Sequence, residues 1–184
     1  IMKVEQIYTS CLSQGAYFIE SNGEAAVIDP LREVSNYIKI AEESNSKIKY
    51  VFETHFHADF VSGHLTLSNK TGADIVYGPK ADPEFKSIIA EDNQIFKIGK
   101  VTITAIHTPG HTLESTSYLL KDEDGKEYCI FTGDTLLING TGRTDFQGGS
   151  AKDQYNSIFN KILKISWQIG FFNDLKRLTS SQIK

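Results

Sequence analysis

The stretch Thr54-His55-Phe56-His57-Ala58-Asp59-Phe60-Val61-Ser62-Gly63-His64 places three metal-binding side chains, His55, His57 and Asp59, at alternate positions. Side chains two residues apart share a face on an extended segment but point to different sides of a helix. The preceding residues, IKYVFET at 48–54, are β-branched and aromatic, as is typical of a strand. We therefore predict a buried strand that ends by presenting two imidazoles and a carboxylate, a cluster that suits a metal ion. The alternative is a polar loop that happens to contain two histidines.

The composition narrows the class of protein. The 184 residues are 40% hydrophobic and 23% charged, with a net charge of -4, which is ordinary globular composition. The absence of a Lys/Arg cluster argues against a nucleic-acid or membrane-surface partner. No apolar run approaches the ~20 residues that span a bilayer, and the N-terminus lacks the apolar core of a secretory signal. Two cysteines, Cys11 and Cys129, are too few for a disulfide framework, so we expect a cytoplasmic protein.

The rest of the chain alternates short strands with few helices. Strands are expected at 4–8, 16–20, 25–29 and 73–77, hairpins at 95–106 and 116–131, and helices at 34–41 and 63–69; residues 81–90 fit either a helix or a loop. The first three strands are separated by turn residues and predict an antiparallel meander. Two sheets flanked by helices are the natural packing for these elements.

Two further elements place candidate ligands at strand ends. In His107-Thr108-Pro109-Gly110-His111, the Pro-Gly turn aims His111 back over the sheet edge. In Phe131-Thr132-Gly133-Asp134, the carboxylate follows an apolar strand and a glycine that permits close approach of the backbone. Taken singly, the alternatives are a surface-loop histidine at position 111 and a turn aspartate at position 134. Three strand ends that each deliver a ligand favour one metal site made of His55, His111 and Asp134.

The other polar candidates have weaker signals. His64 lies within an expected helix and is interpreted as structural, and His107 closes a strand and fits a packed or solvated residue. The loop 140–149, GTGRTDFQGG, lacks phosphate-loop spacing and a following Lys-Ser/Thr, so a nucleotide site is rejected. Arg143 in this loop fits two roles equally, a contact to a substrate carboxylate and a salt bridge to Asp145.

This ordered set of motifs resembles the metallo-β-lactamase superfamily, and Gly-Arg143-Thr-Asp145-Phe resembles its persulfide dioxygenase branch more than general glyoxalase II. The resemblance covers about residues 4–163. It implies an αββα sandwich with the metal at the edge between the sheets, over a domain at 1–165. The superfamily pattern is His-x-His-x-Asp-His, but here the last position is Phe60, and no histidine follows His111. A site with two metal ions is therefore difficult to build.

A single site of two histidines and one carboxylate is the ligand set of non-haem Fe(II) oxygenases. The resemblance then implies one Fe(II) per chain, with zinc as a substitute, held by His55, His111 and Asp134. His57 and Asp59 would support these ligands or add to them. The implied reaction is oxidation of glutathione persulfide, or a related small persulfide, by O2 to sulfite. Arg143 is the candidate for binding the substrate.

The tail at 166–184 departs from the family, which would continue with a strand, a Pro-x-His turn and a closing helical region. We expect this part of the fold to be incomplete, with Trp167, Phe171 and Phe172 filling the gap or driving association into a homodimer. Some relatives continue into rhodanese sulfurtransferase domains, so a rhodanese is an expected partner. The alternatives are a zinc-dependent thioester hydrolase of the glyoxalase II kind and a truncated chain with a metal site but little activity.

Overall fold

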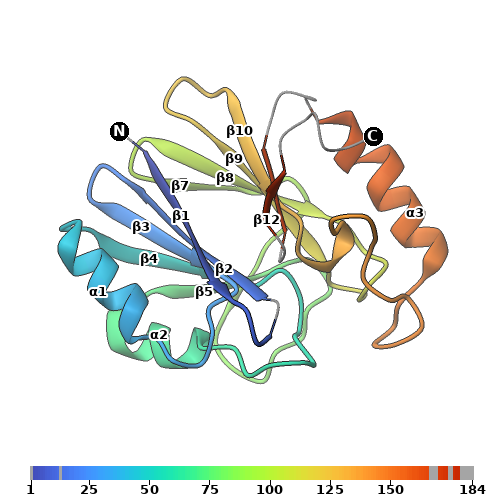
Figure 1. Cartoon of the computed structure of the whole chain (residues 1–184), viewed down its shortest axis with the longest axis horizontal. Coiled ribbons are helices and arrows are strands. Elements are labelled where there is room, and N and C mark those ends of the chain that lie inside the picture. The colour runs from blue at the N-terminus through green and yellow to red at the C-terminus, as the bar shows by residue number, and fades with distance from the viewer. Residues whose placement is uncertain (1, 13, 166–169, 174–175, 179–184) are drawn as a thin grey trace.

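Two six-stranded sheets face each other in the structure, a computed structural model that describes all residues except 1, 13, 166–169, 174–175 and 179–184 (Figure 1). Side chains are described as far as residue 165. Helices α1 (Ser35–Glu43) and α2 (His64–Thr71) lie outside one sheet, and α3 (Ala151–Asn160) lies outside the other. The predicted αββα sandwich is therefore confirmed.

The first sheet contains the strands of the predicted meander. It runs in the order β1 (Lys3–Thr9), β2 (Gln14–Ser21), β3 (Glu24–Ile28), β4 (Lys47–Phe52), β5 (Asp74–Tyr77) and β6 (Ile88–Ile89). Strands β1 to β3 are antiparallel, whereas β3 to β6 are parallel and are joined through α1, α2 and a loop. Residues 81–90, which fitted a helix or a loop, contain no helix and end in the short strand β6.

The second sheet contains both predicted hairpins. Its order is β7 (Ile95–Ile98), β8 (Val101–His107), β9 (Thr116–Lys121), β10 (Glu127–Phe131), β11 (Gly170–Asn173) and β12 (Lys176–Leu178). Strand β11 pairs in parallel with β10, so part of the segment interpreted as an atypical tail extends this sheet. The prediction for Trp167, Phe171 and Phe172 concerns side chains that lie outside the description. Helix α3 was missing from the sequence interpretation; Ser150 caps it by accepting a hydrogen bond from the Asp153 N–H.

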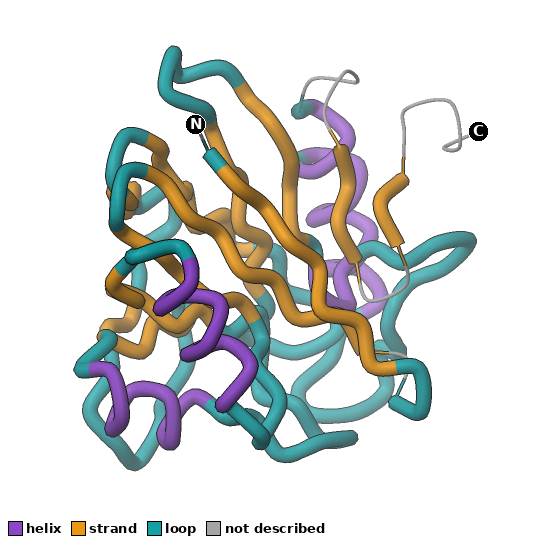
Figure 2. Tube along the Cα trace, turned by 60° about the vertical axis from the view of Figure 1, so that its left-hand side comes forward, coloured by secondary structure: helices purple, strands orange, loops and turns teal. Residues whose placement is uncertain are grey.

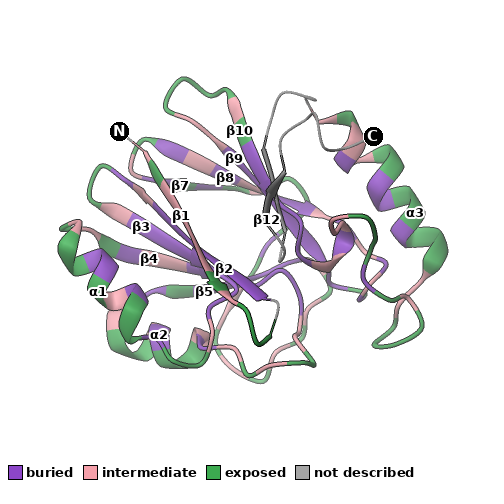
Figure 3. Cartoon of the chain, viewed as in Figure 1, coloured by how far each residue is buried: buried purple, intermediate pink, exposed green. Residues whose placement is uncertain are grey.

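Aromatic rings fill the space between the sheets. The ring of Phe52 on β4 lies 4.9 Å from Tyr118 and 5.3 Å from Phe96, both on the opposite sheet. All three side chains are at most 4% exposed, and Figure 3 shows the buried residues following the strands of both sheets. On the outer face of the first sheet, Tyr37, Ile40 and Ala41 of α1 are buried. Removing a buried ring such as Phe52 typically costs ~3–5 kcal/mol, so this layer fixes how the sheets face each other.

Connecting loops gather along one edge of the sandwich, where β4 and β10 end (Figure 2). The sheets are hydrogen-bonded to each other at this edge, since the Thr116 N–H donates to the Thr54 carbonyl at 2.8 Å. The Tyr118 hydroxyl donates to the Glu53 carbonyl at the same distance. Residues that follow different strands are thus held together at the edge.

Candidate metal centre

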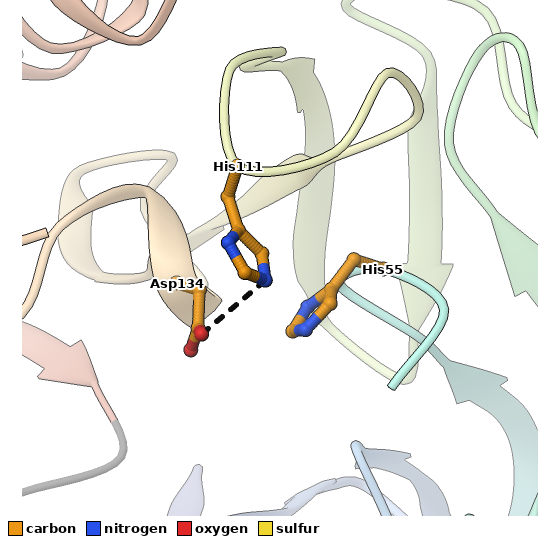
Figure 4. Close-up of side chains that lie close together, drawn as sticks. All are labelled: His55, His111 and Asp134. Atoms are coloured by element: carbon orange, nitrogen blue, oxygen red, sulfur yellow. Dashed lines mark ion pairs between the residues drawn. The ribbon is translucent and has the colours of Figure 1, made fainter. Parts of the chain in front are cut away.

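His55, His111 and Asp134 come together at this edge from three separate segments. His55 follows β4, His111 lies on the loop between β8 and β9, and Asp134 lies in a single 3-10 turn, η1 (Gly133–Thr135), after β10. One ligand atom from each residue lies within 4.8 Å of the other two, and His111 Nε2 is 3.4 Å from Asp134 Oδ2. Figure 4 shows the three side chains pointing toward one another.

Hydrogen bonds orient the two imidazoles so that the same nitrogen of each faces the centre. The His111 Nδ1–H donates to the Arg143 carbonyl at 2.8 Å, because a carbonyl can only accept. The Thr54 hydroxyl donates to Asp29 Oδ2 at 2.8 Å, so at its 2.9 Å contact with His55 Nδ1 it accepts. Nε2 of both rings is then the nitrogen with a lone pair for a metal ion. This is the usual arrangement in which an outer partner fixes the tautomer of a ligating histidine.

Burial keeps His55 in the form that a metal requires. The residue is only 4% exposed, although it contributes to the lining of the cavity described below. Burial lowers the pKa of the His55 imidazole well below its ordinary value, and the neighbouring His57 and His111 lower it further. The ring is therefore neutral at physiological pH. Two neutral imidazoles and one carboxylate are a donor set that fits Fe(II) and also fits zinc.

His57 lies beside His55, with ring centroids 4.1 Å apart, but its Nε2 points toward two buried carboxylates. Asp29 Oδ1 is 3.1 Å from this nitrogen and Glu53 Oε2 is 3.5 Å from it. Asp29, Glu53 and His57 form a second group whose ligand atoms lie within 4.8 Å of one another. The structure therefore places His57 between the candidate ligands and this carboxylate pair.

Asp59 and Phe60 occupy the outer part of the same loop. Asp59 is exposed and lines the cavity over the centre, without joining the three-residue group. The ring of Phe60 packs on His57 with centroids 4.3 Å apart. An apolar ring thus stands where the superfamily pattern has a histidine.

His64 and His107 lie away from the centre. His64 is the first residue of α2; its ring stacks on Phe85, with centroids 5.0 Å apart, and its Nδ1 is 3.5 Å from Glu53 Oε1. His107 ends β8, and its Nε2 is 2.9 Å from the Leu113 carbonyl. Neither belongs to the group formed by His55, His111 and Asp134.

A cavity of about 440 Å³ opens over the centre. Its lining combines the candidate ligands with the loop after β10, including Leu137, Arg143 and Phe146. Arg143 makes a two-pronged ion pair with Asp145, with N–O distances of 2.8 and 3.0 Å, and its guanidinium lies 5.7 Å from the Phe146 ring centroid. Of the two roles open for Arg143, the structure shows the salt bridge and also places the residue at the cavity.

Three carboxylates that support the loop, and the hydroxyl of Ser62, were missing from the sequence interpretation. Asp29 accepts from the Thr54 N–H and hydroxyl, and Glu114 accepts from the Phe56 N–H at 2.9 Å. Ser62 Oγ donates to Glu53 Oε1 at 2.6 Å. Asp29 ends an apolar strand just as Asp134 does, so the same signal could have identified it. Glu53 was visible only as a charged residue near the end of the strand predicted at 48–54, and in the structure it directly follows β4.

Comparison with known proteins places these residues in a family. The model of the metallo-beta-lactamase superfamily matches residues 10–165. A cytoplasmic hydroxyacylglutathione hydrolase from Arabidopsis thaliana is 35% identical over 82% of this chain and 59% of its own length. The mitochondrial persulfide dioxygenase ETHE1 from Mus musculus is 35% identical over 77% of this chain and 55% of its own length.

Solved structures agree on the architecture. The crystal structure of ETHE1 from Myxococcus xanthus has a TM-score of 0.88 and 27% identity, covering 98% of this chain and 80% of that one. A metallo-beta-lactamase from Staphylococcus aureus has a TM-score of 0.86 and 33% identity, covering 97% of this chain and 58% of that one. The chain thus spans little more than half the length of the curated relatives it matches.

None of the described helices combines the length and apolar character needed to cross a membrane. The relatives named above come from both the cytoplasm and the mitochondrion, so the compartment stays a prediction. The matched model extends from before β2 to beyond α3 and includes all three candidate ligands. With the sandwich fold and this match over most of its length, the chain belongs to the metallo-beta-lactamase superfamily.

Proposed function

We propose that the chain is a mononuclear non-haem iron persulfide dioxygenase. The observation that carries the proposal is the convergence of His55, His111 and Asp134 beside Phe60, whose ring packs on His57 where a second metal would need an imidazole. Two histidines and a carboxylate on one side of a metal leave open positions for O2 and a substrate, as in non-haem Fe(II) oxygenases.

The reaction oxidises the outer sulfur of glutathione persulfide, or of a related small persulfide. One persulfide, one O2 and one water give the thiol, sulfite and two protons: the S–S bond breaks, the outer sulfur loses four electrons and O2 gains them. Bound Fe(II) would supply the O2 activation that no side chain can provide. His55, His111 and Asp134 would hold it, with Asp134 balancing one of its charges.

The chain's own residues bind and orient the substrate. Arg143 lines the cavity, and its partner Asp145 is exposed. Exposed ion pairs contribute ~0–1 kcal/mol, so a substrate carboxylate can replace Asp145 at little cost. Phe146 and Leu137 give the cavity apolar walls that favour the sulfur atoms over water.

A second candidate is a zinc-dependent thioester hydrolase, which is favoured by the equal identity to a hydroxyacylglutathione hydrolase. A thioester hydrolase of the glyoxalase II type would use two zinc ions. Asp59 lines the cavity and could contribute to a second ion, but Phe60 could not.

Metal analysis and two assays separate the candidates. Protein purified without added metal should contain about one iron per chain and consume one O2 per sulfite formed when given glutathione persulfide. It should not hydrolyse lactoylglutathione at a comparable rate. About two zinc ions per chain together with thioester hydrolysis and no persulfide-dependent oxygen uptake would reject the dioxygenase in favour of the hydrolase.

A further inference from the structure

Gln154 is a buried amide on α3, the helix that lies outside the second sheet, and the proposed reaction does not use it (Figure 1). The residue is 3% exposed, and together with Ser157 and Ile158 it forms the buried side of the helix. An amide in such a place requires hydrogen-bond partners, because burying a polar group without them is costly.

The NH2 group of Gln154 donates to the segment that carries Asp134. Its Nε2 lies 3.2 Å from the Asp134 carbonyl oxygen and 2.9 Å from the Thr135 carbonyl oxygen. The group has two hydrogens, so it serves both carbonyls at once. Both carbonyls belong to η1, the turn from which the Asp134 side chain reaches the centre. The amide thus holds this turn from the side of the helix.

The same residue packs against the turn that carries His111. Gly110, which precedes His111, has a φ of 148°, and a Cβ built on it would lie 2.3 Å from Gln154 Cα and 2.3 Å from Gln154 Oε1. The Gly110 carbonyl accepts from the N–H of Ser150, the N-cap of α3, at 2.8 Å. The helix therefore rests directly on the backbone before His111, with no space for a side chain between them.

The amide oxygen of Gln154 shows that the donor contacts, and not packing alone, determine this residue. Oε1 is buried and has no hydrogen-bond partner among the described residues. Turning the amide over would place this oxygen against two carbonyl oxygens, so the two donated hydrogen bonds set its orientation. An apolar side chain of similar size would fill the same space without leaving an acceptor unpaired.

We propose that Gln154 is a positioning residue of the metal centre, which fixes Asp134 relative to His111. One side chain on a helix joins the two turns that supply these ligands from the second sheet, whereas His55 comes from the first. The inference rests on the metal centre of the proposed function but not on persulfide chemistry. The competing explanation is that Gln154 only fastens α3 to the sheet.

The test measures Co(II) binding, whose absorption spectrum reports the geometry of the ligands, on variants of the full chain. Gln154→Met keeps the length of the side chain but removes both polar atoms. It should weaken Co(II) binding ~10–100-fold, as the loss of a residue that supports a ligand does, and should change the visible spectrum. At the same free Co(II) concentration, the metal should also raise the melting temperature less than it does in the unaltered chain.

Lys161→Met is the matched control, because it loosens the other end of the same helix. Lys161 Nζ donates to the His107 carbonyl at 2.6 Å and to Asp92 Oδ2 at 3.1 Å. This variant should lower the melting temperature of the metal-free protein without changing the Co(II) affinity or the spectrum. Normal Co(II) binding by Gln154→Met, or an equal loss in Lys161→Met, would overturn the inference. Unchanged affinity in Asp134→Asn would instead reject the metal centre itself, so the two failures are distinguishable.

A measurement on the unaltered chain removes the dependence on how the variants fold. Zinc binding should shift the NMR signals of the Gln154 side-chain NH2 and slow the exchange of its hydrogens with solvent, because the two turns are then held by the ion. The NH2 of Gln6, which donates to the Tyr17 hydroxyl at 3.2 Å, is the internal reference and should not change. Gln154 signals that stay the same while zinc binds would overturn the inference.

Discussion

Gly142 offers a sharp test of the metal centre, because a single added methyl group at this position meets two candidate ligands. Its N–H donates to the Asp134 carbonyl at 2.7 Å. A Cβ built on Gly142 would lie 2.7 Å from Asp134 Cβ, 2.7 Å from Asp134 O and 2.7 Å from His111 Nδ1. Ordinary contact begins near 3.4 Å, so each of these atoms is about 0.7 Å too close. In Gly142→Ala, therefore, either the loop must move or both ligands must.

The expected loss of metal affinity follows from how precisely the ligands of a metal ion must be placed. Metal–ligand distances normally lie within ~0.2 Å of their standard values. Mutating residues that only support the ligands already changes metal affinity ~10–100-fold. A displacement of several tenths of an ångström at both Asp134 and His111 should therefore weaken Zn(II) or Co(II) binding by at least ~10-fold. Calorimetric titration of the metal-free protein measures this directly, and thermal melting of the same samples checks that the variant is folded.

Gly140→Ala is the matched control, since a Cβ at Gly140 meets no atom within 4 Å. It lies in the same loop two residues away and should bind the metal as the unaltered chain does. Tight, unchanged metal binding by Gly142→Ala would refute the placement of Asp134 and His111 around one ion. An equal loss in both variants would show that the loop tolerates no substitution and that the contact argument is wrong.

Four other outcomes are expected. Asp134→Asn should lose most of the bound iron and all persulfide-dependent oxygen uptake, whereas Asp145→Asn should keep the metal; metal counts and oxygen-electrode traces on both decide. Phe60→His should not create a tight second site, because no histidine follows His111 to complete it, and two tight zinc sites in the unaltered chain by calorimetry would contradict this. Arg143→Gln should raise KM ~10–100-fold for a substrate bearing a carboxylate, with iron content unchanged, if its guanidinium makes a charged hydrogen bond worth ~1.5–3 kcal/mol. When the free metal concentration is ~100 times Kd, removing the metal should lower the free energy of unfolding by ~2.7 kcal/mol, which is measured as a lower melting temperature.

The sequence predicted the sandwich well because its strands carry strong local signals. The meander before Pro30, the hairpin turning at Gly99 and the hairpin around 122–125 combine apolar runs with turn residues, and all three appear in the structure. Helix α3 was not predicted, although it has a capping serine. It follows a glycine-rich loop, and its two exposed aromatic residues, Tyr155 and Phe159, place apolar side chains on the face that is usually polar.

The candidate ligands could also be predicted, because each follows a strand or a sharp turn that fixes where its backbone points. Their supporting partners could not. Asp29 and Glu114 lie 25 and 58 residues from the backbone groups they accept from, Thr54 and Phe56. Such pairings depend on how the two sheets are packed, and no local pattern encodes them. The same holds for Arg143, whose carboxylate partner was one of two equal choices until the loop conformation was known.

The arrangement of the site explains why overall similarity does not separate the two candidate reactions. His55 comes from the first sheet, whereas His111 and Asp134 come from the second, so the strands and their packing fix the ligand triangle. Most identity between relatives is expected in this frame, and the chain is 35% identical to both a hydrolase and a dioxygenase. In the function proposed above, the features that would select a reaction lie on the loops instead: the Phe60 ring, which packs on His57, would limit the site to one ion, and Arg143, which lines the cavity, would hold the substrate. Evidence about function should therefore come from the number of metal ions and from these two loop residues.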